Sequence, residues 1–127
     1  MANPANLTVT DLAANAAVAQ PTANAIDTNG TVPAALEGAH DRVILEVNNT
    51  DDAALTVTIK AGAESAGAIR GSIGDLAVAV PAGTVRVIGP FESARFAQDG
   101  GALNVAFLAA TGAPAASVRC YRLSKSA

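Results

Sequence analysis

The sequence predicts an all-β fold: a single small antiparallel β-sandwich or barrel with an extended N-terminal arm. Three observations indicate this class. From residue 42 onward, apolar and polar residues alternate along short runs with a period of two, which is typical of half-buried strands. Turns that contain glycine or proline separate the runs at intervals of roughly 8–16 residues, as in sandwiches and small barrels. The chain has 127 residues, a length that suits one domain.

The first two strands of this domain are predicted on either side of a polar turn. Residues 43–47 are rich in β-branched side chains, and the polar cluster at 48–52 ends the run. Residues 55–60 then place Leu55, Val57 and Ile59 on one face, with threonine and lysine on the other. Together the two runs predict an antiparallel hairpin.

Four more strands are predicted at 76–80, 85–88, 103–107 and 118–123, with a further short strand at 93–96. The segment 81–83 reads Pro-Ala-Gly and is typical of a tight turn. Residues 98–101 read Gln-Asp-Gly-Gly, a hairpin-turn pattern. The glycine-containing loop 61–74 is long enough to hold a partner.

The first part of the chain has a different composition. Residues 1–35 are predicted as a partly extended N-terminal arm, residues 36–123 as the sandwich domain and residues 124–127 as a polar tail. A short strand is expected at 7–10, and the alanine-rich stretch 11–20 fits either a short helix capped by Asp11 or an extended arm. We favour strand and arm. The chain holds 31 alanines against 30 Val, Ile, Leu and Phe together, so the core is small and oligomerisation would add buried area.

Composition also argues against several functions. A single cysteine, Cys120, excludes an intrachain disulfide framework, and a single histidine, His40, excludes a multi-histidine metal site. The net charge of −3 argues against a nucleic-acid surface. No apolar run approaches the roughly 20 residues that span a bilayer. Residues 1–4 contain no basic residue and no apolar h-region, so we expect no secretory signal and synthesis in a cytoplasm, with no cofactor, metal, nucleic acid or membrane as partner.

No catalytic arrangement stands out among the reactive side chains. His40 and Asp41 are adjacent and usually point apart in extended chain, so His40 is interpreted as a polar loop residue. Cys120 is interpreted as a small buried hydrophobe. The paired carboxylates Asp51 and Asp52 lack the spacing of a calcium loop and are interpreted as turn residues. We therefore expect no enzyme.

Arg95 is the basic residue of most interest, because it lies between the aromatic residues Phe91 and Phe96. A guanidinium there can stack on a ring or hold a carboxylate across a subunit boundary. An ion pair with Glu92 within the chain is the alternative.

Several segments resemble small virion proteins of tailed bacteriophages, the capsid decoration or cement proteins. These segments include VILEVNNT at 43–50, VTIKAG at 57–62, IGPFESARF at 88–96 and VRCYRL at 118–123. Residues 7–12, 27–30 and 74–76 are similar as well. The resemblance implies a β-sandwich that binds the outside of the major capsid protein shell, often as a homotrimer at local three-fold positions, and reinforces the head.

On this hypothesis the protein belongs on the capsid exterior, and the arm 1–35 and the loop 61–74 are the expected contact surfaces. A phage tail or head–tail connector component is the first alternative. A carbohydrate-binding β-sandwich module is the second, although it would stack sugars on exposed aromatics and this chain has no tryptophan. The expected interface residues are Leu7, Val9, Leu12, Val18, Arg70 and Arg95.

Overall fold

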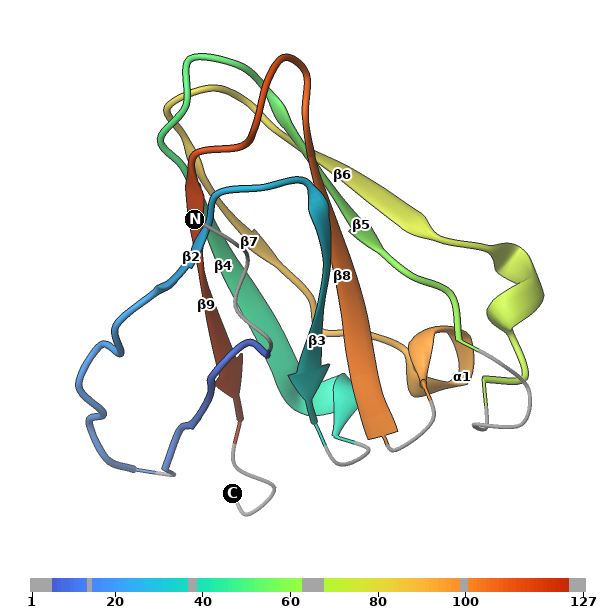
Figure 1. Ribbon diagram of the computed structural model, residues 1–127. Coiled ribbons are helices and arrows are strands. Elements are labelled where there is room, and N and C mark those ends of the chain that lie inside the picture. Colours follow the sequence, from blue (N-terminus) through green and yellow to red (C-terminus); the bar gives the residue numbers. More distant parts are fainter. Residues whose placement is uncertain (1–5, 14, 37–38, 63–67, 99–100, 124–127) are drawn as a thin grey trace.

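The protein folds as a sandwich of two β-sheets (Figure 1). The computed structural model describes residues 6–13, 15–36, 39–62, 68–98 and 101–123. The described elements follow the order β1 (Val9–Asp11), β2 (Asn24–Ile26), β3 (Gly30–Ala35), η1 (His40–Arg42), β4 (Val43–Asn49), β5 (Leu55–Ile59), η3 (Gly71–Ile73), β6 (Leu76–Val80), β7 (Val85–Ile88), α1 (Ser93–Phe96), β8 (Ala102–Ala109) and β9 (Ala116–Arg122).

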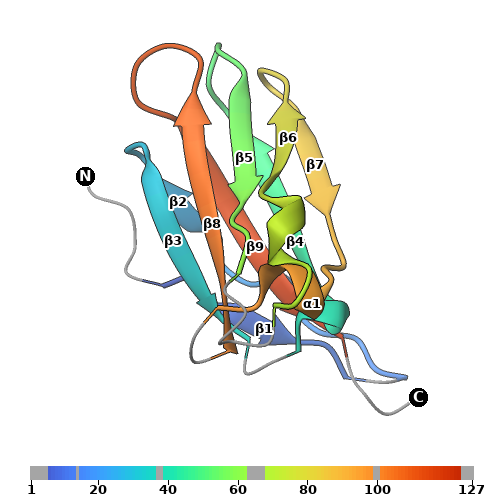
Figure 2. The ribbon, with the colours of Figure 1, turned by 90° about the vertical axis from the view of Figure 1, so that its right-hand side faces the viewer.

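One sheet has the order β1-β9-β4-β7, with β2 also paired to β9, and the other has the order β3-β8-β5-β6. Every described strand pair is antiparallel except β1 with β9. The two sheets lie face to face and do not close into a barrel (Figure 2). The all-β sandwich is therefore confirmed, and the barrel alternative is not needed.

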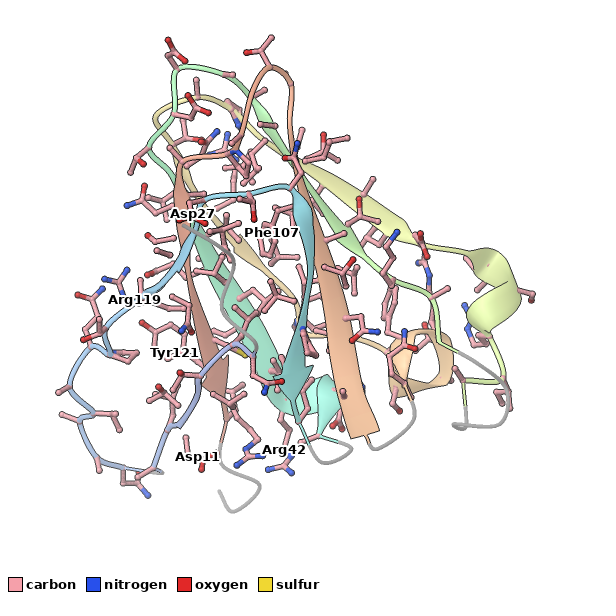
Figure 3. The ribbon with its side chains drawn as sticks, viewed as in Figure 1. Asp11, Asp27, Arg42, Phe107, Arg119 and Tyr121 are labelled. Atoms are coloured by element: carbon pink, nitrogen blue, oxygen red, sulfur yellow. The ribbon has the colours of Figure 1, made fainter. Side chains whose placement is uncertain are left out.

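The core lies between the sheets and follows the predicted alternation. Strand β4 buries Val43, Leu45 and Val47 and leaves the residues between them partly exposed. Strand β8 alternates in the same way, and its Phe107 is only 1% exposed between the two sheets (Figure 3). Burial of one face per strand is what the period of two implies.

The predicted hairpin of residues 43–47 with 55–60 is wrong. Strand β4 pairs with β7 and β9, whereas β5 pairs with β6 and β8, so the polar turn carries the chain from one sheet to the other. The buried Asn49 holds this crossing, because its Nδ2 donates to the Ala53 oxygen at 2.9 Å and to the Val80 oxygen at 3.1 Å. The alternation of apolar and polar residues shows which face of a strand is buried, but it does not determine which other strand pairs with it.

The short strand predicted at 93–96 is also wrong, because these residues form the single-turn helix α1. Glu92 lies at its N-cap, and its carbonyl oxygen accepts from the Phe96 amide at 3.1 Å. The turn brings Phe91 and Phe96 together edge to face, with 6.1 Å between ring centroids, and both rings are buried. In a strand, two residues five positions apart would point to opposite faces.

The Gln98–Gly101 turn is present, since the Gly101 amide donates to the Gln98 oxygen at 3.0 Å. It joins α1 to β8 and not two strands of a hairpin, so the hairpin part of that prediction is wrong. Residues 99 and 100 lie outside the described part of the chain.

The described part of residues 1–35 takes part in both sheets. Strands β1 and β2 lie one after the other along the same edge of β9, and β3 forms the edge of the second sheet beside β8. Within 11–20, the residues that the structure describes form no helix, in line with the preference for strand and arm. The predicted polar tail 124–127 lies outside the described residues.

Ion pairs fasten the start of the chain to β9. Arg122 binds both carboxylate oxygens of Asp11, one of them at 3.0 Å, and Arg42 lies at the same end of the molecule (Figure 3). The hydrogen bonds from Arg122 hold the pKa of the Asp11 carboxyl below its ordinary value of 3.8. Arg119 binds Glu46 at 3.0 Å and donates to the Pro21 oxygen at 2.9 Å.

Candidate contact surface

Two isoleucines project from the segment 68–75, which joins the loop after β5 to strand β6. Ile69 is 73% exposed and Ile73 is 51% exposed. Both belong to the loop 61–74 that the sequence predicts as a contact surface. The segment contains η3 and lies against α1 at one side of the sandwich (Figure 2). We call the two isoleucines and their supporting segment 68–75 the isoleucine loop.

Backbone hydrogen bonds hold the isoleucine loop on α1. The Arg70 amide donates to the Ala94 oxygen at 2.5 Å, and the Ile73 amide donates to the Arg70 oxygen at 3.1 Å. Before the loop, the Gly62 amide donates to the Arg95 oxygen at 2.8 Å. Backbone bonds therefore attach to α1 both the isoleucine loop and the chain that leads into the stretch before it.

The Arg95 side chain adds a second attachment. Its Nε donates to the Gly74 oxygen at 3.0 Å and its Nη2 to the Asp75 oxygen at 3.2 Å, while its guanidinium carbon lies 4.8 Å from the centre of the Phe96 ring. The stacking predicted for Arg95 is thus present, but with its own chain. The Arg95 side chain therefore holds the end of the isoleucine loop by hydrogen bonds to its backbone and does not pair with Glu92.

Charges around the isoleucine loop are paired within the chain. Arg70 forms an ion pair with Glu92, and Lys60 lies 3.6 Å from the Asp75 carboxylate. The second Asp75 oxygen accepts from the Ala61 amide at 2.7 Å. Exposed pairs of this kind contribute little to stability, but they leave the surface around the isoleucines nearly neutral.

Two glycines permit the close packing beneath the loop. A Cβ on Gly62 would lie 1.9 Å from the Ala97 oxygen, and a Cβ on Gly71 would lie 2.4 Å from the Gly62 oxygen. Both distances are far inside van der Waals contact with backbone atoms that cannot turn aside. The two glycines therefore serve close backbone approach.

The isoleucine loop is a preorganised apolar surface. Fully burying an isoleucine side chain is worth about 1.5–3 kcal/mol, so covering these two partly exposed side chains is worth on the order of 3 kcal/mol. A loop that is already fixed loses less conformational entropy when a partner covers it. Among the described residues, Ile69 is the most exposed large apolar side chain.

The predicted interface residues fall into two groups. Arg70 and Arg95 meet at the isoleucine loop, where both bind atoms of their own chain. The N-terminal group lies on the opposite side of the sandwich, around β1 and the long connection to β2 (Figure 1). Val18 is 40% exposed there, whereas Val9 and Leu12 are partly buried.

Leu7 does not belong to a contact surface. It is 2% exposed, its amide donates to the Pro33 oxygen at 2.9 Å, and it forms a parallel bridge with Ala34. The bridge places Leu7 beside β3, at the edge of its sheet, and the Leu7 side chain packs in the core. The sequence predicts Leu7 as an interface residue of the arm, whereas in the structure its side chain completes the core of the sandwich.

The reactive residues occupy structural positions. His40 is fully buried in η1 and not in an exposed loop, and its Nε2 lies 3.0 Å from the Ala102 oxygen. Cys120 is buried as predicted, and burial raises the pKa of its thiol to about 12. Phe91, Phe96 and Phe107 are buried in the core. They therefore offer no stacking surface of the kind that a carbohydrate-binding module uses.

Within the part of the chain that the structure describes, no group of three or more His, Cys, Asp or Glu residues is placed to hold a metal ion, and no pocket is formed. None of the described helices has the length and apolar character needed to cross a membrane.

Comparisons with protein-family models, with curated proteins and with solved structures found no match to this chain.

One exposed apolar site lies outside both predicted surfaces. Val85 and Val87 of β7 are 49% and 65% exposed. The alternation of residues 85–88 predicts a strand but not that this strand lies at the edge of its sheet, and edge position is the reason for the exposure.

Proposed function

We propose that this protein is a structural component of a bacteriophage virion: a capsid decoration protein that binds the outer surface of the major capsid protein shell and stabilises the head. The isoleucine loop carries the proposal. A decoration protein works by contact alone, and its contact surface gains most from apolar side chains on a backbone that is already fixed. Arg95, Gly62 and Gly71 fix that backbone under Ile69 and Ile73.

The division of the surface also supports a role within an assembly. The isoleucine loop and the N-terminal connection around Val18 lie on opposite sides of the sandwich (Figure 1). A subunit of this kind can contact the shell with one side and a neighbouring copy with the other. In the proposed assembly the copies form a homotrimer. The net charge of −3 fits the exterior of a shell better than its DNA-facing interior.

The proposal places the protein on the capsid exterior after synthesis in the host cytoplasm. Cryo-microscopy of the particles that contain this chain tests the location. Density for the sandwich on the outer surface of the shell is expected. Density within the tail or at the connector would refute the decoration role, and so would the absence of density for the sandwich from the shell. Light scattering of the purified protein tests the trimer, and a hexameric or dodecameric ring would favour the connector alternative.

A binding experiment tests the contact surface separately. The double variant Ile69→Ser, Ile73→Ser is mixed with shells that lack the protein, and bound protein is measured by sedimentation. Loss of on the order of 3 kcal/mol of apolar contact should weaken binding about hundredfold. Leu108→Ser is the matched control, because Leu108 is an apolar residue that is 58% exposed on the outer face of β8, outside the isoleucine loop. Equal binding by both variants would remove the isoleucine loop from the proposal.

A further inference from the structure

Strand β7 leaves one long side without a partner. It ends the order of its sheet and pairs only with β4 among the described strands. Strand β6 ends the other sheet on the same side of the sandwich, so both sheet edges are open there (Figure 2). The open edge of β7 is the feature from which the following inference is drawn.

The register decides which backbone groups face this open edge. The Asn49 amide donates to the Thr84 oxygen at 2.9 Å, so in the antiparallel ladder the pairs Val47–Arg86 and Leu45–Ile88 also exchange hydrogen bonds. The residues between them, Val85 and Val87, then direct their amides and carbonyls away from β4.

Among the described residues, only one hydrogen bond reaches these outward groups. The Arg86 Nη1 donates to the Val85 oxygen at 3.4 Å, which is a long contact for a hydrogen bond. The amides of Val85 and Val87 and the Val87 carbonyl have no bond to another described residue. Groups with this spacing match the backbone of one added strand.

The side chains of β7 specify what such a strand would carry. Val85 and Val87 lie on the outer face, opposite Asn48 and Glu46 of β4, and both are about half exposed or more. Arg86 points to the other face and is exposed at the sandwich edge. Apolar residues therefore fit beside the two valines, and the residue between them would lie beside Arg86.

Arg86 also differs in charge pairing from four other cations of the described chain. Lys60, Arg70, Arg119 and Arg122 each have a carboxylate partner. No described acidic side chain lies within ion-pair distance of Arg86. A carboxylate at the facing position of an added strand would supply that partner.

We propose that the β7 edge accepts an extended segment of another polypeptide, one with an acidic residue facing Arg86 and apolar residues beside Val85 and Val87. The β7 strand of a second copy does not fit. In the symmetric antiparallel register, the outward groups of Val85 pair with those of Val87 in the second copy. The Arg86 residues of the two copies would then lie directly opposite each other, and like charges in that position are destabilising. The inference goes beyond the virion proposal and does not depend on it.

Amide hydrogen exchange with a peptide probe tests the inference. The probe is a short capped peptide with a glutamate between two valines, and the control peptide has lysine in place of the glutamate. At saturating glutamate peptide, exchange of the Val85 and Val87 amides should slow at least tenfold. The lysine peptide should bind about fivefold more weakly, because an exposed like-charge contact replaces an ion pair. In Arg86→Glu this preference should reverse.

A proline scan separates the edge from the ladder. Val87→Pro removes an amide that faces outward, so the melting temperature should stay close to that of the native protein while peptide binding is lost. Arg86→Pro removes an amide that bonds to β4, and it should lower the melting temperature clearly. The charge reversal in Arg86→Glu provides an independent readout if a proline variant does not fold.

Three results would overturn the inference. The first is unchanged exchange of the Val85 and Val87 amides at every concentration of the glutamate peptide. The second is equal affinity for the two peptides in both the native protein and Arg86→Glu. The third is concentration-dependent dimerisation that protects these amides without peptide, which would make a second copy the occupant.

Discussion

Replacing Phe107 with alanine is expected to lower the free energy of unfolding by about 4 kcal/mol. The ring is 1% exposed on β8, between Val57 of β5 and Gly30 of β3. A phenylalanine buries roughly 150–250 Å² at about 25 cal/mol per Å², and measured losses for Phe→Ala in cores are about 3–5 kcal/mol. The facing Gly30 has no side chain that could fill the space.

Thermal unfolding followed by circular dichroism measures the effect. For a chain of 127 residues the unfolding entropy is about 0.27 kcal/mol per kelvin, so a loss of about 4 kcal/mol lowers Tm by about 15 °C. Leu108→Ala is the matched control on the same strand, because its side chain is 58% exposed and should change stability by no more than about 0.5 kcal/mol. Equal shifts in the two variants, or an unchanged Tm for Phe107→Ala, would show that the assigned strand face is wrong.

Three further predictions follow from single contacts. Cys120, with its pKa raised to about 12, should react with a thiol reagent at pH 8 only as the protein unfolds in denaturant; rapid reaction of the folded protein would contradict its burial. The lowered pKa of Asp11 means that its pair with Arg122 stabilises the fold above the ordinary pKa of 3.8 and that this contribution is lost as the pH falls further; in Asp11→Asn the acid-induced loss should be smaller, and identical pH profiles would rule out the contribution. Gly62→Ala should cost about 1–3 kcal/mol in chemical denaturation, since its Cβ would overlap the Ala97 oxygen; a native midpoint would show that the loop backbone shifts freely.

Much of the fold follows from the sequence, because strand alternation is a local property. The inward positions of Leu45, Val57 and Phe107 can be assigned from the period of two, and all three are buried. Partners cannot be assigned in the same way. The side-chain pattern of β4 suits any neighbour with an apolar face, and only the crossing held by Asn49 places β5 in the other sheet.

The helix α1 shows a second limit. Residues 93–96 are too few to show a helical period, and the signal lies in the five-residue spacing of Phe91 and Phe96. Two buried rings at odd spacing require the chain to turn between them. That requirement becomes visible only when both rings are known to share one core.

The position of the isoleucine loop in the sequence is predictable, but the contacts that hold its backbone in place are not. The glycines of 61–74 indicate a loop, and the isoleucines inside it are visible in the sequence. The contacts of Arg95 with Gly74 and Asp75 depend on helix and loop meeting in space. The open edge of β7 is not predictable for a related reason: Val85 and Val87 fit a half-buried strand until the strand is known to have one neighbour.

The pairing of β1 with β9 has a consequence for the biogenesis of the protein. Asp11 and Arg122 are 111 residues apart in sequence, yet they face each other across this pair. On the ribosome, β1 and β2 emerge long before the strand whose edge they cover. The sheet that contains them stays incomplete until residues 116–122 are synthesised. The first two strands therefore take their places in the sheet only after residues 116–122 have been made, and contacts of such sequence separation slow the final step of folding.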